Sequence, residues 1–444
     1  MVDDALRFCL VGTFYPPYNF GGDGIYAHRL ANALAQRGHR VTVIHSPSAY
    51  ELLAGGPPRE GYDDDPRVTV HGLRTPLGIL GLLPVHQTGR AALQGAALRR
   101  LLDGGSFDVI HYNNVSLLGG VEAFRFGRGL KLCTLSDHWL VCPMHTLWKF
   151  DREVCTRPTC YRCTLAGGRP PQLWRDAGVA RAAPRWIDAF LGPSLFTIRQ
   201  HRTRGLEGTF VHLPQFQRAL PERGESGIRA GRPYFLYAGR LEKLKGVQTA
   251  IPMLRSRPDV DLLIAGSGSM EAELRALAGT APNVRFLGSL AQSELAPLYR
   301  GALATIVPSL CYETFGLVVA ESFAAGTPVI VHAQGALDEI VRTHGGGLIY
   351  RDAGELGQAV DALASDAPLR ERLAGEARAA FEREFSERVH LDRYLALVRE
   401  LIARKRAGHP LARAHHEELE PRLAGRPVFV EPPARGGARE SGPA

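Results

Sequence analysis

The feature that most constrains the fold is a regular alternation of short apolar segments with longer amphipathic segments. Apolar segments typical of strands fall at residues 6–11, 41–45, 68–71, 108–112, 131–135 and 189–192, and helical patterns between them include residues 25–37, 88–102 and 195–204. Helices that alternate with strands return the chain to the same edge of a sheet, so the strands run parallel. This part of the chain is therefore predicted to be a doubly wound α/β domain.

The alternation is interrupted once and then resumes. Residues 218–232 are rich in glycine and charge, which indicates a linker, and strand patterns return at residues 234–238, 260–265, 284–287, 302–307, 329–331 and 348–350. We expect two Rossmann-like domains, residues 1–217 and 233–385, that face each other across a cleft. A helix at residues 386–404 is expected to cross back to the first domain, and the Pro-, Gly- and Arg-rich tail 405–444 to be disordered.

Composition excludes several classes of protein. Of the 444 residues 45% are hydrophobic and 22% charged, as in a globular protein. No stretch reaches the roughly 20 apolar residues of a membrane span. The net charge of +8 is spread along the chain without a recognisable nucleic-acid module, so no nucleic-acid partner is expected. Because the first residues do not resemble a signal peptide, we expect a cytoplasmic protein.

Two loops at predicted strand ends suit a phosphorylated ligand. In the first domain Gly21 and Gly22 open a helix, and glycines allow the backbone to approach a ligand closely. In the second domain Arg240 and Lys245 follow the first strand, where their charges can converge on a diphosphate. The alternative for each is a surface loop with solvated charges. The first loop is too long and too rich in proline for a dinucleotide-binding fingerprint, which argues against an oxidoreductase.

Glu313 and Glu321 flank the start of another predicted helix. This helix is expected at residues 315–325 with Thr314 as its N-cap, so Glu313 lies in the loop after a strand and Glu321 on the helix. Free amides at a helix start bind phosphate, and carboxylates accept hydrogen bonds from sugar or ribose hydroxyls. Together these features indicate a nucleotide-sugar site. The alternative is an ordinary strand–helix junction with two solvated glutamates.

From about residue 6 to about residue 400 the chain resembles a family 4 glycosyltransferase of the two-domain type called GT-B. The matching motifs are Gly21-Gly22, Gly38-His39-Arg40-Val41, Gly239-Arg240-Leu241 with Lys245-Gly246, Ala265-Gly266-Ser267-Gly268, and Pro308-Ser309 followed by the two glutamates. Each motif is moderately specific, and their common order and spacing make the resemblance strong. It implies transfer of a sugar from a nucleotide-diphosphate sugar to a hydroxyl acceptor, with retention at the anomeric carbon and no catalytic metal.

The resemblance also implies roles for individual residues. Glu313 would hold sugar hydroxyls at the catalytic centre, and Glu321 would hold the ribose. The rest of the donor would be held by a larger set of side chains and backbone groups: Arg240, Lys245, Phe315, Gly316, Leu317, Gly21 and Gly22. The leaving phosphate would itself accept the proton of the acceptor, so no protein nucleophile is implied.

The acceptor side departs from the family's pattern. Many relatives carry a His-Asp-aromatic-Trp run after the fifth strand, whereas this chain reads Ser136-Asp137-His138-Trp139, with serine in place of the histidine. Either His138 replaces that histidine from a shifted position, or Asp137 alone carries the polar role and His138 is an ordinary loop residue. Histidine suits the role because it changes protonation near neutral pH. We therefore place Asp137 and His138 among the candidate catalytic residues.

Four of the seven cysteines fall in a short insert, residues 142–163, just after this run: Cys142, Cys155, Cys160 and Cys163. Four thiolates that end in a Cys-x-x-Cys pair can form a tetrahedral zinc site. In a reducing compartment zinc or free thiols are favoured over disulfides. We expect a structural zinc ion, with an iron–sulfur cluster or unliganded thiols as the alternatives.

Residues 73–85 are unusually apolar for a predicted loop, and Arg90, Arg99 and Arg100 follow them. This segment is either a surface that meets a lipid-linked acceptor or the inner face of a membrane, or a loop packed within the domain. For the whole chain three other functions remain open. They are a synthase- or phosphorylase-like enzyme of the same fold, a Rossmann oxidoreductase and a non-catalytic scaffold.

Overall fold

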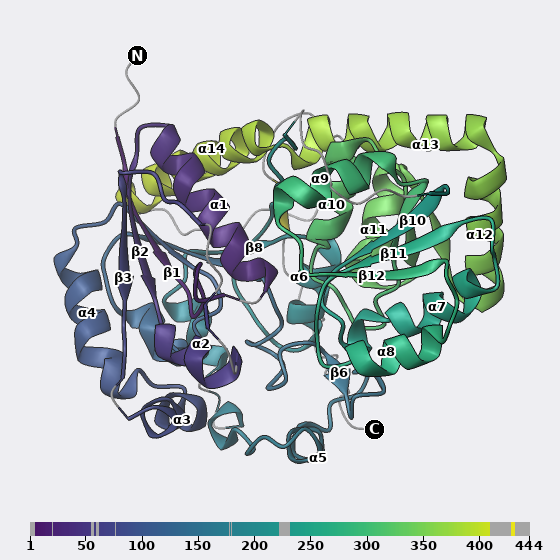
Figure 1. Cartoon of the computed structure of the whole chain (residues 1–444). Helices are drawn as coiled ribbons and strands as arrows, with labels where there is room; N and C mark the ends of the chain where they lie inside the picture. The colour runs from purple at the N-terminus through teal and green to yellow at the C-terminus, as the bar shows by residue number, and fades with distance from the viewer. Residues whose placement is uncertain are drawn as a thin grey trace, which may run out of the picture.

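The computed structural model describes residues 5–19, 21–54, 57–58, 62–75, 77–176, 178, 180–221, 231–408 and 428–430. It confirms two α/β domains, each built on a largely parallel sheet with its own apolar cores (Figure 1). Residues 222–230 of the predicted linker, and 409–427 and 431–444 of the predicted disordered tail, lie outside the described residues.

The N-terminal domain has an eight-stranded sheet of order β16-β9-β8-β5-β4-β1-β2-β3. Its neighbouring strands pair in parallel except β16, which runs antiparallel to β9. Alternate residues of β1 enter two cores, Phe8 one and Cys9 the other, because helices cover both faces of the sheet. The elements are β1 (Arg7–Val11), α1 (Gly22–Gln36), β2 (Arg40–His45), α2 (Pro47–Ala54), β3 (Val68–Gly72), α3 (Ile79–Thr88), α4 (Gly95–Gly104), β4 (Val109–Tyr112), β5 (Leu130–Thr134), β8 (Ala189–Gly192), α6 (Leu195–Thr203), β9 (Phe210–His212) and β16 (Val428–Val430).

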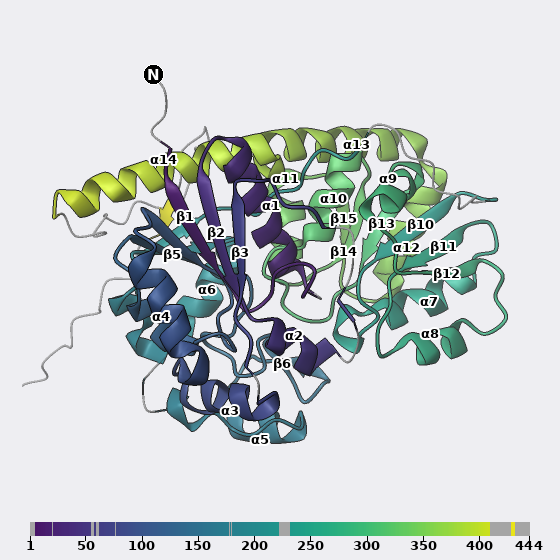
Figure 2. The same ribbon diagram turned by 60° about the vertical axis from the view of Figure 1, so that its left-hand side comes forward.

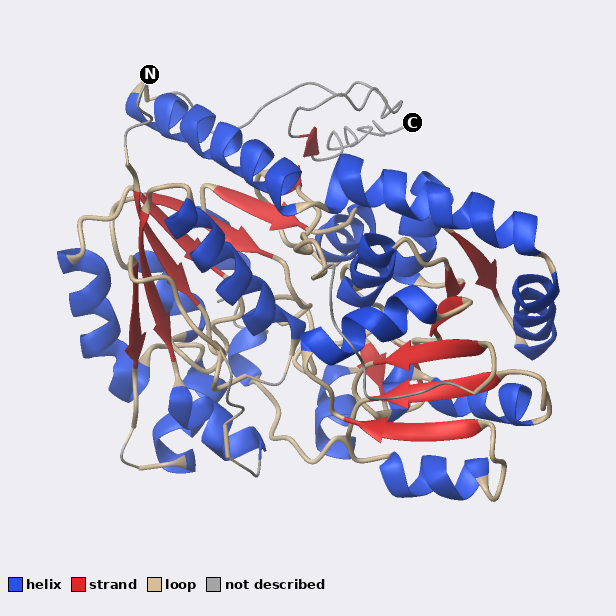
Figure 3. Cartoon of the chain, turned by 45° about the horizontal axis from the view of Figure 1, so that its top comes forward, coloured by secondary structure: helices blue, strands red, loops and turns tan. Residues whose placement is uncertain are grey.

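The C-terminal domain has a six-stranded parallel sheet of order β12-β11-β10-β13-β14-β15. Phe235 and Leu236 of β10 enter cores on opposite faces, which helices cover (Figure 3). The elements are β10 (Tyr234–Ala238), α7 (Val247–Arg255), β11 (Asp261–Ala265), α8 (Glu271–Ala278), β12 (Val284–Gly288), α9 (Gln292–Gly301), β13 (Ala304–Val307), α10 (Leu317–Ala325), β14 (Val329–His332), α11 (Gly335–His344), β15 (Gly347–Tyr350), α12 (Ala353–Ser365) and α13 (Ala367–Ala380).

The last long helix, α14 (Glu387–Arg406), returns from the C-terminal domain to the N-terminal one. It lies along the N-terminal sheet in Figures 1 and 2, and its apolar side joins the same core as β1. Tyr394 stacks on His111 of β4, with their oxygen and Nδ1 atoms 2.9 Å apart. At its far end Lys405 Nζ lies 2.6 Å from a carboxylate oxygen of Asp188. The helix therefore joins the two domains.

Two segments differ from the sequence-based expectations. Residues 73–85 were predicted to be a loop, but they contain most of α3, because Leu82 and Val85 recur at helical spacing and are buried. The cysteine insert contains the short antiparallel pair β6 (Trp148–Lys149) and β7 (Glu153–Val154), followed by the helix α5 (Cys160–Ala166). Periodicity could not predict strands as short as these.

Candidate functional site

The candidate site lies between the domains, where several strands of each sheet end. Gly21 follows β1, Asp137 follows β5, and Glu313 follows β13. Helices α1 and α10 begin beside each other, because a Cβ atom on Gly22 would lie only 3.0 Å from Leu317 Cδ1. The N-termini of two helices, both partly positive, thus meet between the domains, which suits an anionic ligand.

Glu313 is held by a cation and a hydroxyl group. Lys245 Nζ lies 2.6 Å from Glu313 Oε1, and Ser309 Oγ donates to the same oxygen at 2.7 Å. Burial raises the pKa of the Glu313 carboxyl, but the charge and hydrogen bond of Lys245, together with the Ser309 hydrogen bond and the charge of Arg240, outweigh burial and hold this pKa below its usual value. Burial likewise lowers the pKa of Lys245, but the charge and hydrogen bond of Glu313, together with the nearby Cys311, outweigh burial and raise this pKa. Both groups are therefore charged at neutral pH, and Glu313 Oε2 remains to accept a bond from a ligand hydroxyl.

Glu321 lies on α10 and is paired with a residue of the other domain. Arg29 Nη2 of α1 is 3.1 Å from Glu321 Oε1, and the buried Tyr299 donates its hydroxyl to Oε2 at 3.0 Å. The Arg29 side chain is only 10% exposed. Its buried Nη1 atom has no hydrogen-bond partner among the described residues. Each oxygen of Glu321 keeps a second lone pair that can accept a hydroxyl bond.

The start of α10 differs from the prediction. The helix begins at Leu317 with Gly316 at the N-cap position and φ of 100°, so Thr314 is not the N-cap. A Cβ atom on Gly316 would lie 2.5 Å from Leu337 Cδ2, which explains the need for glycine. Phe315 is buried and packs edge-on against Phe385. Val319 donates its amide to the carbonyl oxygen of Gly316 at 2.9 Å, which leaves the amides of Leu317 and Val318 as the first-turn donors for a ligand.

Thr314 joins the domains instead of capping the helix. Its carbonyl oxygen accepts bonds from Ser194 Oγ at 2.8 Å and Thr197 Oγ1 at 3.0 Å, both in the N-terminal domain. Its own hydroxyl donates to the carbonyl oxygen of Ser136 at 2.9 Å. Ser136 directly precedes Asp137, and Thr314 directly follows Glu313. These bonds therefore hold the two candidate catalytic loops together.

Arg240 lies near this centre but does not contact Glu313. Its guanidinium pairs with Glu242 of its own loop at 2.6 Å. Its charge also lowers the pKa of Glu313 and of Asp23, so it is close to both carboxylates. Burial and then the charge of Asp137 raise the pKa of Asp23 from 3.8 to about 6. The Gly21-Gly22 loop therefore brings a further carboxylate, Asp23, into the site.

The histidine beside Asp137 is His145, not His138. His145 Nδ1 lies 3.0 Å from Asp137 Oδ2, and Asn114 Nδ2 donates to the same oxygen at 2.6 Å. His138 is 1% exposed and stacks on His201 with ring centroids 5.2 Å apart. Burial holds the pKa of His138 well below its usual value, so it is neutral. The proposal that His138 takes the place of the family's histidine is therefore wrong for this arrangement, because its ring is packed inside the protein.

Comparison with known proteins agrees with this geometry. Residues 20–214 match the family described as glycosyltransferase family 4, and residues 220–380 match glycosyl transferases group 1. A D-inositol 3-phosphate glycosyltransferase of Acidothermus cellulolyticus is 33% identical over 77% of this chain and 78% of its own length. A glycogen synthase of Mycobacterium tuberculosis is 38% identical over 86% of this chain and 91% of its own. This chain belongs to glycosyltransferase family 4.

Solved structures place this family 4 glycosyltransferase in the GT-B fold. The sucrose-phosphate synthase of Thermosynechococcus elongatus matches with a TM-score of 0.68 and 21% identity over 90% of this chain and 99% of its own. The HepE protein of Anabaena, solved with UDP and glucose, matches with a TM-score of 0.63 and 18% identity over 91% of this chain and all, 100%, of its own. At these identities the matches establish the fold.

Three residues of the glycosyltransferase site were not predicted from the sequence. The position of Arg29 could have been predicted, because it lies seven residues after Gly22 and thus two turns further along the same face of α1. Asp23 is adjacent to a predicted glycine pair, so its position could have been inferred. His145 had no such signal, because a loop with φ of 69° at that residue brings it back to Asp137.

The cysteine insert packs beside the site. Cys142 and Cys155 form a small apolar cluster with Leu147, Cys163 is buried, and Cys160 is exposed at the start of α5. The four thiols are near one another, because after burial their mutual charges help to raise the pKa values of Cys155 and Cys160. In the part of the chain that the structure describes, no group of three or more His, Cys, Asp or Glu side chains is arranged to hold a metal ion. The zinc site stays a prediction.

Among the described helices none has both the length and the apolar character needed to cross a lipid bilayer.

Proposed function

We propose that this enzyme transfers a sugar from a nucleotide-diphosphate sugar to a hydroxyl group of an acceptor, with retention of the anomeric configuration and without a catalytic metal. The observation that supports it most is the pairing of Glu313 with Lys245 beside the N-termini of α1 and α10. Carboxylate, ammonium and free amides within one cleft match the hydroxyls and the diphosphate of such a donor. The HepE relative, solved with UDP and glucose, has the same fold.

In the proposed reaction the bond between the anomeric carbon and the diphosphate oxygen breaks. Negative charge then grows on the leaving diphosphate, and Lys245, Arg240 and the first amides of α10 stabilise it. The acceptor oxygen bonds to the anomeric carbon on the face that the diphosphate leaves. The leaving phosphate takes the proton of the acceptor hydroxyl, so that the products are a glycoside and a nucleoside diphosphate.

On the acceptor side we propose Asp137 as the polar group, oriented by His145 and Asn114. The two contacts to Asp137 Oδ2 fix the carboxylate, while Oδ1 accepts the amide of Trp139 at 3.1 Å. This arrangement favours the open alternative in which the aspartate acts without His138. The aspartate can then orient the incoming hydroxyl of the acceptor.

One candidate acceptor is a glucan chain, because a relative that is 38% identical is a glycogen synthase. A phosphorylated small molecule and a lipid-linked glycan are the other classes. The cytoplasm, with peripheral contact at the inner face of the membrane, is the location that we propose for this reaction in glycan, polysaccharide or glycolipid biosynthesis.

A panel of UDP-, ADP- and GDP-sugars tests the proposal. We expect one nucleotide class to raise the melting temperature, and the product to keep the anomeric configuration of the donor in an NMR assay. Glu321→Ala should abolish detectable transfer and leave the fold intact. The control is Glu355→Ala, which removes a carboxylate from the first turn of α12, far in sequence from Glu313 and Glu321. Near-normal transfer by Glu321→Ala, or inversion of configuration, would contradict the proposal.

A further inference from the structure

Helix α3 carries an apolar side that faces solvent. Gly81, Leu82 and Val85 are buried against the domain. The exposed fractions of the residues on the other side are large: Leu77 54%, Ile79 56%, Leu80 65% and Leu83 40%. A helix on the surface of a globular protein normally presents polar residues outward. Packing within the domain therefore does not explain why the exposed side of α3 is apolar.

The apolar surface continues onto two neighbouring elements. Tyr161 and Leu165 of α5 are exposed, as is Leu173 of the following 3-10 turn (Leu173–Arg175). This turn is fixed to α3, because Trp174 Nε1 donates to the carbonyl oxygen of His86 at 3.0 Å. In both Figure 1 and Figure 2 helices α3 and α5 lie at the end of the domain opposite α14, and the turn that is fixed to α3 follows α5 in the chain. We call these seven exposed residues and their helices the α3–α5 surface.

The same two segments lack acidic residues. Between Asp65 and Asp103, and again between Glu153 and Asp176, the sequence contains no aspartate or glutamate. Three exposed arginines belong to the surface: Arg90 just after α3, Arg162 on α5 and Arg169 just after α5. None of the three forms an ion pair with another described residue, although most exposed arginines of the C-terminal domain do. The α3–α5 surface is thus both apolar and positively charged.

We propose that the α3–α5 surface docks on the surface of a lipid bilayer that contains anionic lipids. Exposed leucines next to unpaired arginines match the acyl–headgroup boundary, where side chains bury in the apolar region and cations bind phosphate headgroups. A large apolar patch on a protein surface marks an interaction site. The carboxylate of Asp176 lies at the edge of this surface and accepts a hydrogen bond from the Tyr161 hydroxyl, while residues 66–102 and 154–175 contain only basic charged residues, which favours an anionic occupant. The inference deepens the peripheral membrane contact proposed above by naming the surface and the charge of the lipids, and because binding requires no turnover its failure would leave the proposed sugar transfer untouched.

Co-sedimentation of the full chain with vesicles tests the inference. We expect binding to vesicles of phosphatidylcholine mixed with phosphatidylglycerol, weaker binding to phosphatidylcholine alone, and loss of binding as salt is raised. The triple variant Arg90→Gln, Arg162→Gln and Arg169→Gln should partition about a hundredfold more weakly into the mixed vesicles. Its control, Arg342→Gln with Arg351→Gln and Arg372→Gln, removes the same charge from the C-terminal domain and should bind nearly as wild type.

The apolar part is tested by Ile79→Gln, Leu80→Gln and Leu83→Gln. These residues are exposed and glutamine is a good helix former, so circular dichroism and the melting temperature should stay as in wild type. Vesicle binding should fall about tenfold or more. Its control is Leu52→Gln with Leu53→Gln, two exposed leucines of α2 outside the surface. Equal binding by all variants, no binding to mixed vesicles, or a dimer that only the α3 variant breaks would overturn the proposal.

Discussion

Arg29 and Glu321 form an ion pair that crosses from one domain to the other, with Nη2 and Oε1 3.1 Å apart. Both side chains are largely buried, and Tyr299 holds the second oxygen of the carboxylate. The residue expected to hold the ribose is therefore oriented by the opposite domain. If Glu321 binds the ribose as proposed, this pair links donor binding to the arrangement of the two domains.

Arg29→Met should weaken binding of the nucleoside diphosphate about tenfold or more, because it leaves a buried carboxylate without its counter-ion. Isothermal titration with the diphosphate of the preferred donor measures this loss. The matched control is Arg37→Met, at the C-cap of the same helix, whose partner Asp392 is exposed. Equal affinities of the two variants would show that Arg29 does not orient Glu321.

Replacement of the cations beside the leaving group should affect turnover more than affinity. Lys245→Ala and Arg240→Ala are expected to lower kcat more than donor binding, since the charge they stabilise grows toward the transition state. Lys245→Ala should have the larger effect, because it also removes the 2.6 Å contact to Glu313. Steady-state kinetics with both substrates checks this, with Lys243→Ala as the control in the same loop. A change confined to KM would contradict the assigned role.

Asp23 gives a prediction on pH. Its pKa is raised in the folded protein from 3.8 to about 6, so the folded state binds the proton more tightly than the unfolded one. Its contribution to stability is therefore lost as pH rises through that window. Asp23→Asn should melt at a higher temperature than wild type at pH 7, and the difference should vanish at low pH. Buried histidines also make the melting temperature depend on pH. The comparison therefore uses the difference in melting temperature between variant and wild type, with Asp259→Asn at an exposed aspartate as the control.

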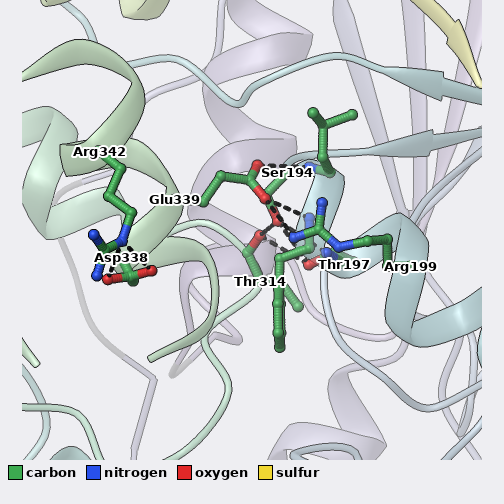
Figure 4. Close-up of polar contacts among 9 residues, drawn as sticks. Ser194, Thr197, Arg199, Thr314, Asp338, Glu339 and Arg342 are labelled. Atoms are coloured by element: carbon green, nitrogen blue, oxygen red, sulfur yellow. Dashed lines mark hydrogen bonds and ion pairs between the residues drawn. The ribbon is translucent and has the colours of Figure 1, made fainter. Parts of the chain in front are cut away.

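Glu339 supplies a second link between the domains. Its two oxygens accept the amides of Leu195 and Phe196 at 2.7 Å each, so a residue of α11 caps the start of α6 (Figure 4). Arg199 Nη2 lies 3.2 Å from the same carboxylate. Figure 4 shows that the neighbouring Asp338 instead pairs with Arg342 on its own helix.

Glu339→Ala should therefore loosen the closed arrangement, while Asp338→Ala should not. We expect a larger radius of gyration by small-angle X-ray scattering and a KM for the donor raised about tenfold, because two hydrogen bonds to a charged group are lost. If both variants scatter and turn over alike, Glu339 has only a local capping role. Burial raises the pKa of Glu339, so the contribution of this carboxyl to the stability of the folded state falls as pH rises through that pKa.

The sequence predicted the parts of this protein that depend on local periodicity. The strands β1 and β10 and the apolar side of α14 could be predicted directly, because the apolar residues of each pattern are the ones that are buried. Thr314 could not, because the N-cap rule considers only the chain around it, whereas its bonds go to Ser194 and Ser136 in the other domain. Likewise His145 reaches Asp137 through a loop whose path no residue pattern specifies. The contacts that were missed are those that no local pattern specifies, either between the domains, as for Thr314, or across an irregular loop, as for His145.

The cysteine insert carries the last prediction. If Cys142, Cys155, Cys160 and Cys163 bind one ion, purified protein should hold about one zinc per chain. Three of these thiols are buried and Cys160 is exposed, so binding must draw the start of α5 inward. Cys160→Ser should lose the zinc, whereas Cys311→Ser, at a buried cysteine of the other domain, should keep it.

Chelation should loosen the insert but leave both cores folded, because they have their own apolar interiors. Acceptor use should then fall before donor binding does, since the insert follows Asp137 directly. Protein prepared under reducing conditions that holds no zinc or iron, with the four thiols freely titratable, would refute the site.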